Sequence, residues 1–395
     1  MKKLTMRRAV AVLFFLSCST AVPQAAGAAG IDELLLDRLV SKGVVTQDEA
    51  AEIRAETAIK TQEELSQKKK FSLEGNTKIS LGGYLQAQFL ADQTAGACDE
   101  YKIRRARLDF RGEPAKNIGW RLQMDAVQPL KVVISSVSQN GTIKTKAVNA
   151  VSRPVLLDAN IDYNLYSFAN IRIGQFYVPF GMENTTSDSF MDIINRSQVT
   201  EKLVPGRDIG AQGRDIGLQV NGDTYFGKEN KILGYMIGVF NGAGMNLDDD
   251  NEYKDFAGRI LVFPIKGLSV GLSGYNGKYG TTNVDKLRAG AEATYTLEGM
   301  SLKAEYVSGK DSAMEKYGWY AQAGYKFIPT VETILKYDSY DPDTNTSGDR
   351  NDILTLGLNW FINKNAKIQV NYEWKNEELT QADNNGLIAQ FQIMY

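Results

Sequence analysis

The chain has 395 residues, of which 43% are hydrophobic, 45 are basic and 47 are acidic, and it contains no histidine. A charge balance this close to zero gives no argument for nucleic acid as a partner. Because histidine is the commonest general base and a common metal ligand, its absence excludes Ser-His-Asp hydrolases and histidine-ligated metal enzymes, and we predict no enzymatic activity, no cofactor and no metal site.

Residues 1–28 are predicted to be a secretory signal peptide. A group of cations precedes an apolar run from Ala9 to Leu16, and small residues follow at 25–28, which is the pattern of such peptides. The cations are Lys2, Lys3, Arg7 and Arg8. Cleavage would leave Cys98 as the one cysteine of the exported protein, so we expect no intramolecular disulfide.

Residues 31–70 differ from the rest of the chain because their apolar residues follow a helical spacing. Leu35 and Leu39 fit a first helix, Gly43 interrupts the pattern, and residues 46–49 form a capping box that opens a second helix. We predict a periplasmic helical segment that forms a coiled coil or a partner-binding arm. The alternative is a short helical lead that is only solvated.

From residue 71 to residue 395, apolar and polar residues alternate, and no segment reaches the roughly twenty apolar residues that a membrane helix needs. A period of two indicates strands. A long antiparallel sheet with a lipid-facing side must close on itself, since hydrocarbon offers no partner to an unpaired edge. We predict an all-β protein, a transmembrane antiparallel β-barrel of about sixteen strands, integral to the bacterial outer membrane. The expected strands lie at residues 79–89, 101–112, 118–127, 155–163, 170–178, 213–220, 231–240, 254–263, 268–276, 286–297, 300–309, 317–327, 330–340, 352–361, 366–375 and 387–395.

The gaps between these segments support the same architecture. Tight and long gaps are expected in strict alternation, which is typical of a barrel with short periplasmic turns and long outer loops. The connection 179–212 is unusually long. We predict that it folds into the lumen as a constriction, where field lines converge; the alternative is a solvated external loop. Its candidate ion-binding residues are Arg196, Lys202, Arg207 and Asp208.

Side-chain parity along each strand predicts which residues face the lumen. On the strand at 101–112 the apolar residues at 106, 108 and 110 face lipid, so the side chains at 105, 107, 109 and 111 face inward. Three of these are arginines, and a row of guanidinium groups attracts anions because arginine stays charged and binds oxyanions bidentately. The alternative is that interleaved carboxylates pair with the arginines. Arg104 has the other parity and is expected on the lipid side, near lipopolysaccharide phosphates. The predicted anion path consists of Arg105, Arg107, Arg111, Arg121, Arg288 and Lys326.

Three stretches carry a family resemblance. They are Arg104 to Leu108 (RRARL), Gly174 to Glu183 (GQFYVPFGME), and Arg196-Ser197 followed by Pro205 to Gly210 (PGRDIG). On these motifs, the chain from about Leu81 to Tyr395 resembles the phosphate-selective porin O and P family. The resemblance implies a trimeric channel with an aromatic assembly signal at Tyr395. It also places the family motif on Gly174, Gln175, Phe176, Pro179, Phe180, Pro205 and Gly206. Tyr177 stands where the family usually has lysine, so one cation beside the loop is absent.

The predicted function is passive diffusion of small anions, phosphate or other oxyanions first, through a water-filled pore whose wall carries arginine and lysine. The expected partners are small anions, outer-membrane lipid and lipopolysaccharide, and further copies of the chain in a homotrimer. Two alternatives remain open. One is a general or weakly cation-selective porin, and the other is a barrel that anchors the helical segment 31–70.

Overall fold

The computed structural model describes residue 42 and residues 70–72, 78–94, 98–129, 135–139, 142–146, 152–226, 230–379 and 382–395. The chain divides into two units, residues 1–72 and 73–395. In the first unit, the described residues are Lys42, in a turn, and the short strand β1 (Lys70–Ser72). Apart from these positions, the predicted signal peptide and helical segment lie outside the described residues. Among the described residues, no helix is long and apolar enough to cross a membrane.

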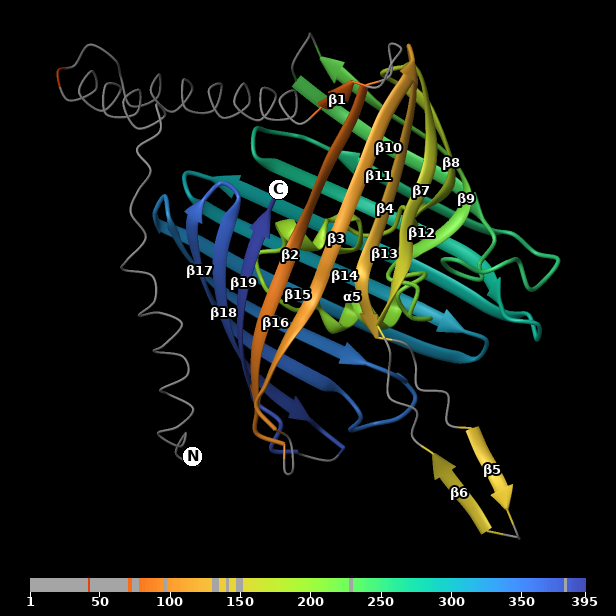
Figure 1. The fold of residues 1–395 in the computed structure, drawn as a ribbon, viewed down its shortest axis with the longest axis vertical. Helices are drawn as coiled ribbons and strands as arrows, with labels where there is room; N and C mark the ends of the chain where they lie inside the picture. The colour runs from red at the N-terminus through yellow and green to blue at the C-terminus, as the bar shows by residue number, and fades with distance from the viewer. Residues whose placement is uncertain are drawn as a thin grey trace. The chain divides into compact units, whose positions relative to one another are not determined.

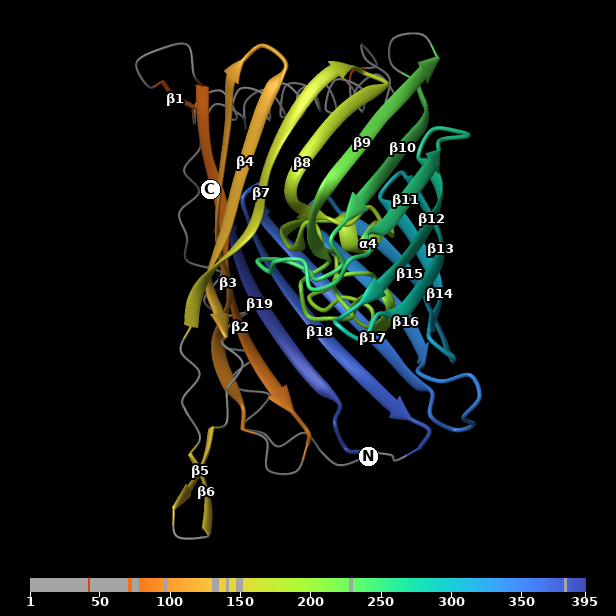
Figure 2. The same cartoon turned by 90° about the vertical axis from the view of Figure 1, so that its right-hand side faces the viewer.

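Sixteen strands of the second unit form a closed antiparallel barrel (Figures 1 and 2). The strands pair in chain order, and β19 pairs with β2 to complete the ring. Closure leaves no unpaired edge, as a hydrocarbon environment requires. The bounds are β2 (Lys78–Asp92), β3 (Glu100–Ala115), β4 (Ile118–Pro129), β7 (Ser152–Tyr166), β8 (Ala169–Tyr177), β9 (Arg214–Phe226), β10 (Asn230–Phe240), β11 (Asp255–Val262), β12 (Leu268–Tyr279), β13 (Val284–Leu297), β14 (Met300–Asp311), β15 (Met314–Ile328), β16 (Val331–Asp341), β17 (Asn351–Asn363), β18 (Ala366–Glu377) and β19 (Gly386–Met394).

Each predicted strand overlaps one strand of this barrel, so the predicted antiparallel barrel is confirmed. The sequence analysis did not predict the short hairpin of β5 (Ser135–Gln139) and β6 (Thr142–Lys146), which lies between β4 and β7 in the chain and forms a separate two-stranded sheet. The dipeptide Asn140-Gly141 between its strands is the signal that could have revealed it, because Asn-Gly favours a tight hairpin turn.

The strict alternation of tight and long gaps is wrong at two places. The connections β12–β13 and β14–β15 should be long outer loops, but they consist only of residues 280–283 and 312–313. Both close in tight turns, in which Asn283 and Ser312 each adopt a φ of 55°. The strands continue beyond their predicted ends, so these hairpins need little connecting chain.

The barrel wall carries apolar side chains on its outer face and polar side chains on its inner face. On β12, Leu272 is 61% exposed whereas its neighbour Ser273 is 8% exposed. On β16, Leu335 is 51% exposed whereas Lys336 is 2% exposed. Exposed leucines beside buried polar groups reverse the usual arrangement of a water-soluble protein. This arrangement suits a barrel that is surrounded by lipid.

Gly83 lies where β2 meets the end of β19, at the closure of the barrel. A Cβ atom at this position would lie 2.1 Å from the Arg107 backbone oxygen and 2.7 Å from the Tyr395 hydroxyl. Gly83 and Tyr395 exchange two backbone hydrogen bonds of 3.0 and 3.1 Å, and the Tyr395 hydroxyl donates to the Arg107 oxygen at 3.0 Å. Tyr395 therefore stabilises the closure of the barrel, and Gly83, which has no side chain, leaves space for the Tyr395 ring.

Residues 178–213, which connect β8 to β9 and which we call the lumen loop, lie inside the barrel (Figure 2). The loop contains α4 (Met182–Thr185), the 3-10 helix η2 (Asp188–Phe190) and α5 (Gln198–Leu203). Its apolar side chains pack against aromatic side chains of the inner wall. The resulting buried core includes Phe180, Val199 and Leu203 of the loop with Tyr275, Tyr320 and Tyr340 of the wall.

Candidate functional site in the barrel lumen

Backbone atoms tie the lumen loop to the inner wall. The Asp188 oxygen accepts a hydrogen bond from Gln86 Nε2 on β2 at 3.4 Å, and the Ser189 oxygen accepts one from Gln392 Nε2 on β19 at 3.1 Å. These donors are neutral amides on the two strands that close the barrel. The position of η2 therefore does not depend only on the charges that it carries.

Asp188 is also the centre of a group of ion pairs. Its carboxylate lies 2.8 Å from Arg107 Nη1, 3.2 Å from Arg105 Nη2 and 3.0 Å from Arg196 Nη2. Asp188 is 7% exposed. Burial raises the pKa of this carboxyl, but the three arginines outweigh burial and hold its pKa well below the usual range. The sequence analysis missed Asp188, because this residue lies in none of the family motifs and strand parity does not apply to a loop.

A second group of ion pairs continues along β3, β4 and β7. The Asp109 carboxylate lies 2.9 Å from Arg111 Nη2 and 2.8 Å from Arg121 Nη2. Arg121 Nη1 also lies 2.8 Å from Asp158. The Arg111 side chain is 60% exposed and that of Arg121 is 25% exposed, so both reach the water of the lumen. An ion pair with an exposed cation, such as Arg111 with Asp109, is weak and can exchange its partner with dissolved ions.

Arg214, at the start of β9, joins the same group although the sequence analysis did not place it there. Its Nε atom lies 2.8 Å from Asp158 Oδ1, and its guanidinium lies 3.8 Å from the centre of the Tyr177 ring. Tyr177 occupies the position at which the family resemblance expected lysine. The Tyr177 ring therefore stacks on the Arg214 guanidinium and adds no positive charge of its own.

Gln212 joins the two groups, because its side-chain oxygen accepts a hydrogen bond from Arg107 and its backbone oxygen accepts one from Arg214. Together with Asp125, the second partner of Arg107, they form one cluster with more positive than negative charge. Six arginines meet four aspartates, so two positive charges stay unbalanced within the set. We call this set the arginine cluster; it consists of Arg105, Arg107, Arg111, Arg121, Arg196 and Arg214 with Asp109, Asp125, Asp158 and Asp188. The predicted row of arginines on β3 is therefore present, and carboxylates pair with these arginines, as the alternative interpretation expected. Guanidinium groups in such a row can hold oxyanions through paired N–H donors.

Arg104 differs from the prediction that it faces lipid. The register between β2 and β3 shifts at Gln86 and Ala87, which leaves Arg104 as the extra residue of a bulge. Its Nη1 atom lies 3.4 Å from Oε1 of Gln88. Gln88 is 1% exposed and donates to Gln390 across the inner wall at 2.7 Å, so Arg104 points into the lumen. A bulge moves the alternation by one residue, and parity alone cannot anticipate it. The expected contact of Arg104 with lipopolysaccharide therefore has no support.

Arg288 and Asp208 are buried between β13 and the lumen loop. Arg288 Nε donates to the Leu203 oxygen at 2.8 Å, and its Nη2 lies 3.0 Å from Asp208. Lys286 Nζ contacts the same carboxylate at 2.6 Å. Arg288 was expected to line the anion path, but it is 2% exposed because the loop covers it. These residues hold the loop in place.

The other predicted cations divide between anchoring and open positions. Arg196 is 8% exposed and Arg207 is 7% exposed, and Arg196 donates to the Glu183 backbone oxygen. Both therefore belong to the packed part of the loop. Lys202 on α5 and Lys326 on β15 are exposed. These two lysines keep their charges in contact with water.

The family-motif residues lie at the end of β8 and within the lumen loop. Gly174 has a φ of 121°, and a Cβ atom there would lie 2.2 Å from the Ala159 oxygen. Phe176 packs on Phe240 with 5.5 Å between the ring centres. Later in the loop, Gly206 has a φ of 79°. The remaining motif residues are buried: Gln175, Pro179, Phe180 and Pro205. The motif shapes the loop and carries no charge of its own.

Carboxylates on the opposite wall hold the start of the loop. Glu305 on β14 accepts hydrogen bonds from the backbone N–H groups of Met182, at 2.6 Å, and Glu183, at 2.9 Å. The Glu183 carboxylate lies 3.3 Å from Lys336 Nζ. Burial raises the pKa of Glu183, but Lys336 and Arg196 outweigh burial and lower its pKa to about 2.

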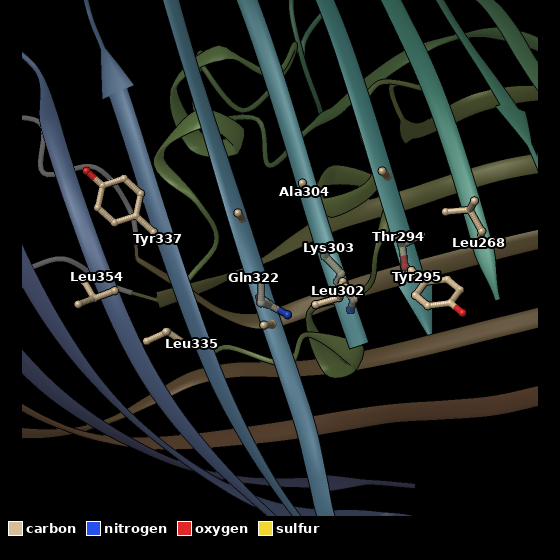
Figure 3. Close-up of a pocket in the computed structure, with 13 residues that line it drawn as sticks. Leu268, Thr294, Tyr295, Leu302, Lys303, Ala304, Gln322, Leu335, Tyr337 and Leu354 are labelled. Atoms are coloured by element: carbon tan, nitrogen blue, oxygen red, sulfur yellow. The ribbon is translucent and has the colours of Figure 1, made fainter. Parts of the chain in front are cut away.

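A cavity of about 490 Å³ lies on the outer face of the wall, over β12 to β17 (Figure 3). Ala293, Ala304 and Ala321 lie opposite one another on neighbouring strands and leave a hollow, which Leu335 and Tyr337 border. These side chains have the outward parity and are apolar. The cavity is therefore no candidate for ion binding.

Comparison with known sequences gives two findings. A family model described as "Phosphate-selective porin O and P" matches residues 71–395. The chain is also 26% identical to an uncharacterized protein of Aquifex aeolicus (strain VF5), over 86% of this chain and 88% of that protein.

Solved porin structures share the fold at low sequence identity. OmpF of Salmonella typhi, in a complex with daunomycin, has a TM-score of 0.59 at 14% identity, over 82% of this chain and 100% of that chain. An anion-selective porin from Comamonas acidovorans has a TM-score of 0.55 at 13% identity, over 81% and 100%. OmpT of Vibrio cholerae in its trimer form has a TM-score of 0.54 at 9% identity, over 81% and 99%. At these identities the likeness shows the barrel fold alone.

Proposed function

Because the chain belongs to the phosphate-selective porin O and P family, we propose that it is an outer-membrane porin for the passive diffusion of small anions, phosphate and other oxyanions first. The observation that carries the proposal is the arginine cluster beside the lumen loop. Its six guanidinium groups exceed its four carboxylates, and the two most exposed, those of Arg111 and Arg121, offer donors in the planar geometry that oxyanions bind.

Exposure within the cluster suggests how an anion passes. Arg111 and Arg121 share the Asp109 carboxylate and are open to water, so an incoming anion can compete with that carboxylate for their N–H groups. The exposed charges of Lys202 and Lys326 add to the attraction along the lumen. Binding to partly neutralised groups is weak enough for release, as conduction requires.

The setting of the channel belongs to the same proposal. We place it in the bacterial outer membrane after cleavage of residues 1–28, with residues 31–70 in the periplasm. The trimer form of OmpT, whose barrel fold this chain shares, supports a homotrimer. The family and the barrel fold point to a channel and not to an enzyme.

A general or weakly cation-selective porin is the second candidate. The observation that favours it is the pairing within the cluster: Arg105, Arg107 and Arg111 each contact a carboxylate. If these pairs neutralise the wall, the pore distinguishes little between small ions.

Single-channel recording in a planar lipid bilayer tests the proposal. Phosphate should block chloride current at low salt, and the block should weaken toward 1 M salt, where the screening length falls to about 3 Å. Arg121→Gln should weaken the block. The matched control Arg350→Gln, which removes a 44% exposed arginine outside the cluster, should leave it unchanged. Absence of any conduction would reject the porin, and conduction without phosphate block would favour the second candidate.

A further inference from the structure

We propose that Asp188 is a selectivity-determining residue, a carboxylate built into the lumen loop that occupies anion-binding groups of the wall and so limits how tightly a passing anion is held. This inference rests on the proposed function. It concerns a residue that neither strand parity nor the family motif identifies, and it assigns a role to the charge of that residue beyond fixing the loop.

The geometry is that of a tethered oxyanion. Asp188 Oδ1 contacts Arg105 and Arg196, while Oδ2 contacts Arg107 at 2.8 Å. A carboxylate that bridges guanidinium groups uses the same donors that a phosphate or another oxyanion would use. Asp188 therefore competes with mobile anions for Arg105 and Arg107.

Both wall arginines have other partners that keep them in position. Arg105 Nη1 donates to Gln86 Oε1 at 2.9 Å. Arg107 Nε donates to Asp125 at 3.2 Å and its Nη2 donates to Gln212 Oε1 at 3.1 Å. Loss of the Asp188 charge would therefore leave two positioned cations whose N–H groups can donate to a dissolved anion.

The position of the loop does not depend on the charge of Asp188 alone. The backbone oxygens of residues 188, 189 and 191 accept hydrogen bonds from Gln86, Gln392 and Lys367 on three strands. Asparagine has the shape of aspartate and keeps one acceptor oxygen. The substitution Asp188→Asn thus changes the charge of the cluster by one unit while the loop keeps its anchors.

The consequence for transport follows from the balance that conduction needs. An ion must bind well enough to be recruited and weakly enough to leave. With Asp188 ionised, the arginine cluster has two positive charges in excess; without it, the excess rises to three. Asp188 therefore favours fast release over tight binding.

The test compares wild type, Asp188→Asn and Ser189→Ala in planar bilayers. Ser189→Ala is the matched control, because it removes the hydroxyl contact with Ser187 in the same turn and changes no charge. We measure the reversal potential in a low-salt KCl gradient, the phosphate concentration for half block of chloride current, and conductance in 1 M KCl. In 1 M KCl charges are screened within about 3 Å, so conductance reports pore width.

Asp188→Asn should move the reversal potential toward the chloride equilibrium value and lower the half-blocking phosphate concentration by about tenfold, since a full charge acts at hydrogen-bonding distance. Conductance in 1 M KCl should match wild type in both variants. Unchanged selectivity at unchanged conductance would overturn the proposal. If Asp188→Asn does not assemble, Arg196→Gln must shift selectivity toward cations, because it frees Asp188 of one partner and lowers the positive excess of the cluster from two to one, and no shift would overturn the proposal equally.

The same data separate this inference from the proposed function. A wild-type pore without anion preference, combined with a shift in Asp188→Asn, would reject the proposed function and keep the role of Asp188. An anion-selective wild type combined with an unshifted Asp188→Asn would keep the proposed function and reject the role of Asp188.

Discussion

Replacing Arg107 with glutamine should destabilise the barrel far more than the same change at Arg111, although both belong to one row on β3. The Arg107 side chain is 1% exposed and its partners Asp125 and Asp188 are 0% and 6% exposed. Arg107→Gln removes the guanidinium that neutralises two buried carboxylates. Breaking a buried ion pair from one side costs about 3–5 kcal/mol.

Arg111 provides the contrast. Its side chain is 60% exposed, and its partner Asp109 keeps the contact with Arg121 at 2.8 Å when Arg111 is lost. An exposed pair contributes about 0.2–1 kcal/mol. The two substitutions remove the same group from the same strand, so the expected difference of about 2–5 kcal/mol reflects the burial of Arg107 and of its two carboxylate partners.

The assay is urea unfolding of the barrel in detergent micelles. The folded fraction at each urea concentration is measured by the heat-dependent shift of the barrel on electrophoresis. Arg107→Lys serves as a further control because it keeps the charge and loses the fork-shaped geometry, so its midpoint should lie between wild type and Arg107→Gln. Equal midpoints for Arg107→Gln and Arg111→Gln would refute the reasoning, since they would show that water solvates the whole charged wall.

Three further outcomes are expected. Gly83→Val should prevent or weaken barrel closure, because a Cβ atom would lie 2.1 Å from a backbone oxygen; the readout is loss of the heat-modifiable form on electrophoresis. Gly82→Val is the control and should assemble, because the nearest atom to a Cβ there is 3.4 Å away. The pKa of Glu183 is lowered to about 2 and that of Asp188 is also lowered, so both ionised carboxylates stabilise the fold above the unfolded-state pKa of about 4 and lose this contribution as pH falls through the folded-state pKa. Single-channel conductance should therefore stay constant from about pH 7 to 5. A change in conductance within this range would contradict the argument. Deletion of residues 31–67 should leave the conductance of each pore nearly unchanged, since the predicted helices precede the first barrel strand, and a closed or unassembled barrel would show that they act on the pore.

Strand periodicity was sufficient to predict the barrel because the lipid and lumen faces demand opposite side chains. The pattern at Leu272 and Ser273 repeats around the wall, and a period of two leaves little freedom for another architecture. The hairpin β5–β6 was missed because its residues do not alternate in this way, although Asn140-Gly141 marks its turn.

The site was harder to predict, because its partners are distant in sequence. Parity identified Arg105, Arg107 and Arg111, but their pairing with Asp188 depends on how the lumen loop folds. Arg104 was assigned to the wrong face because the bulge on β3 adds one residue to the alternation. Burial of Arg288 under Leu203 likewise arises from loop packing, which no local pattern encodes.

The most direct test of the central claim is the reversal potential of the wild-type pore in a tenfold KCl gradient at low ionic strength, where the charges of the lumen are least screened. The surplus of guanidinium over carboxylate in the arginine cluster predicts a potential displaced toward the chloride equilibrium value. A potential displaced toward the potassium value would contradict the anion channel and show that the paired carboxylates determine the selectivity of the pore.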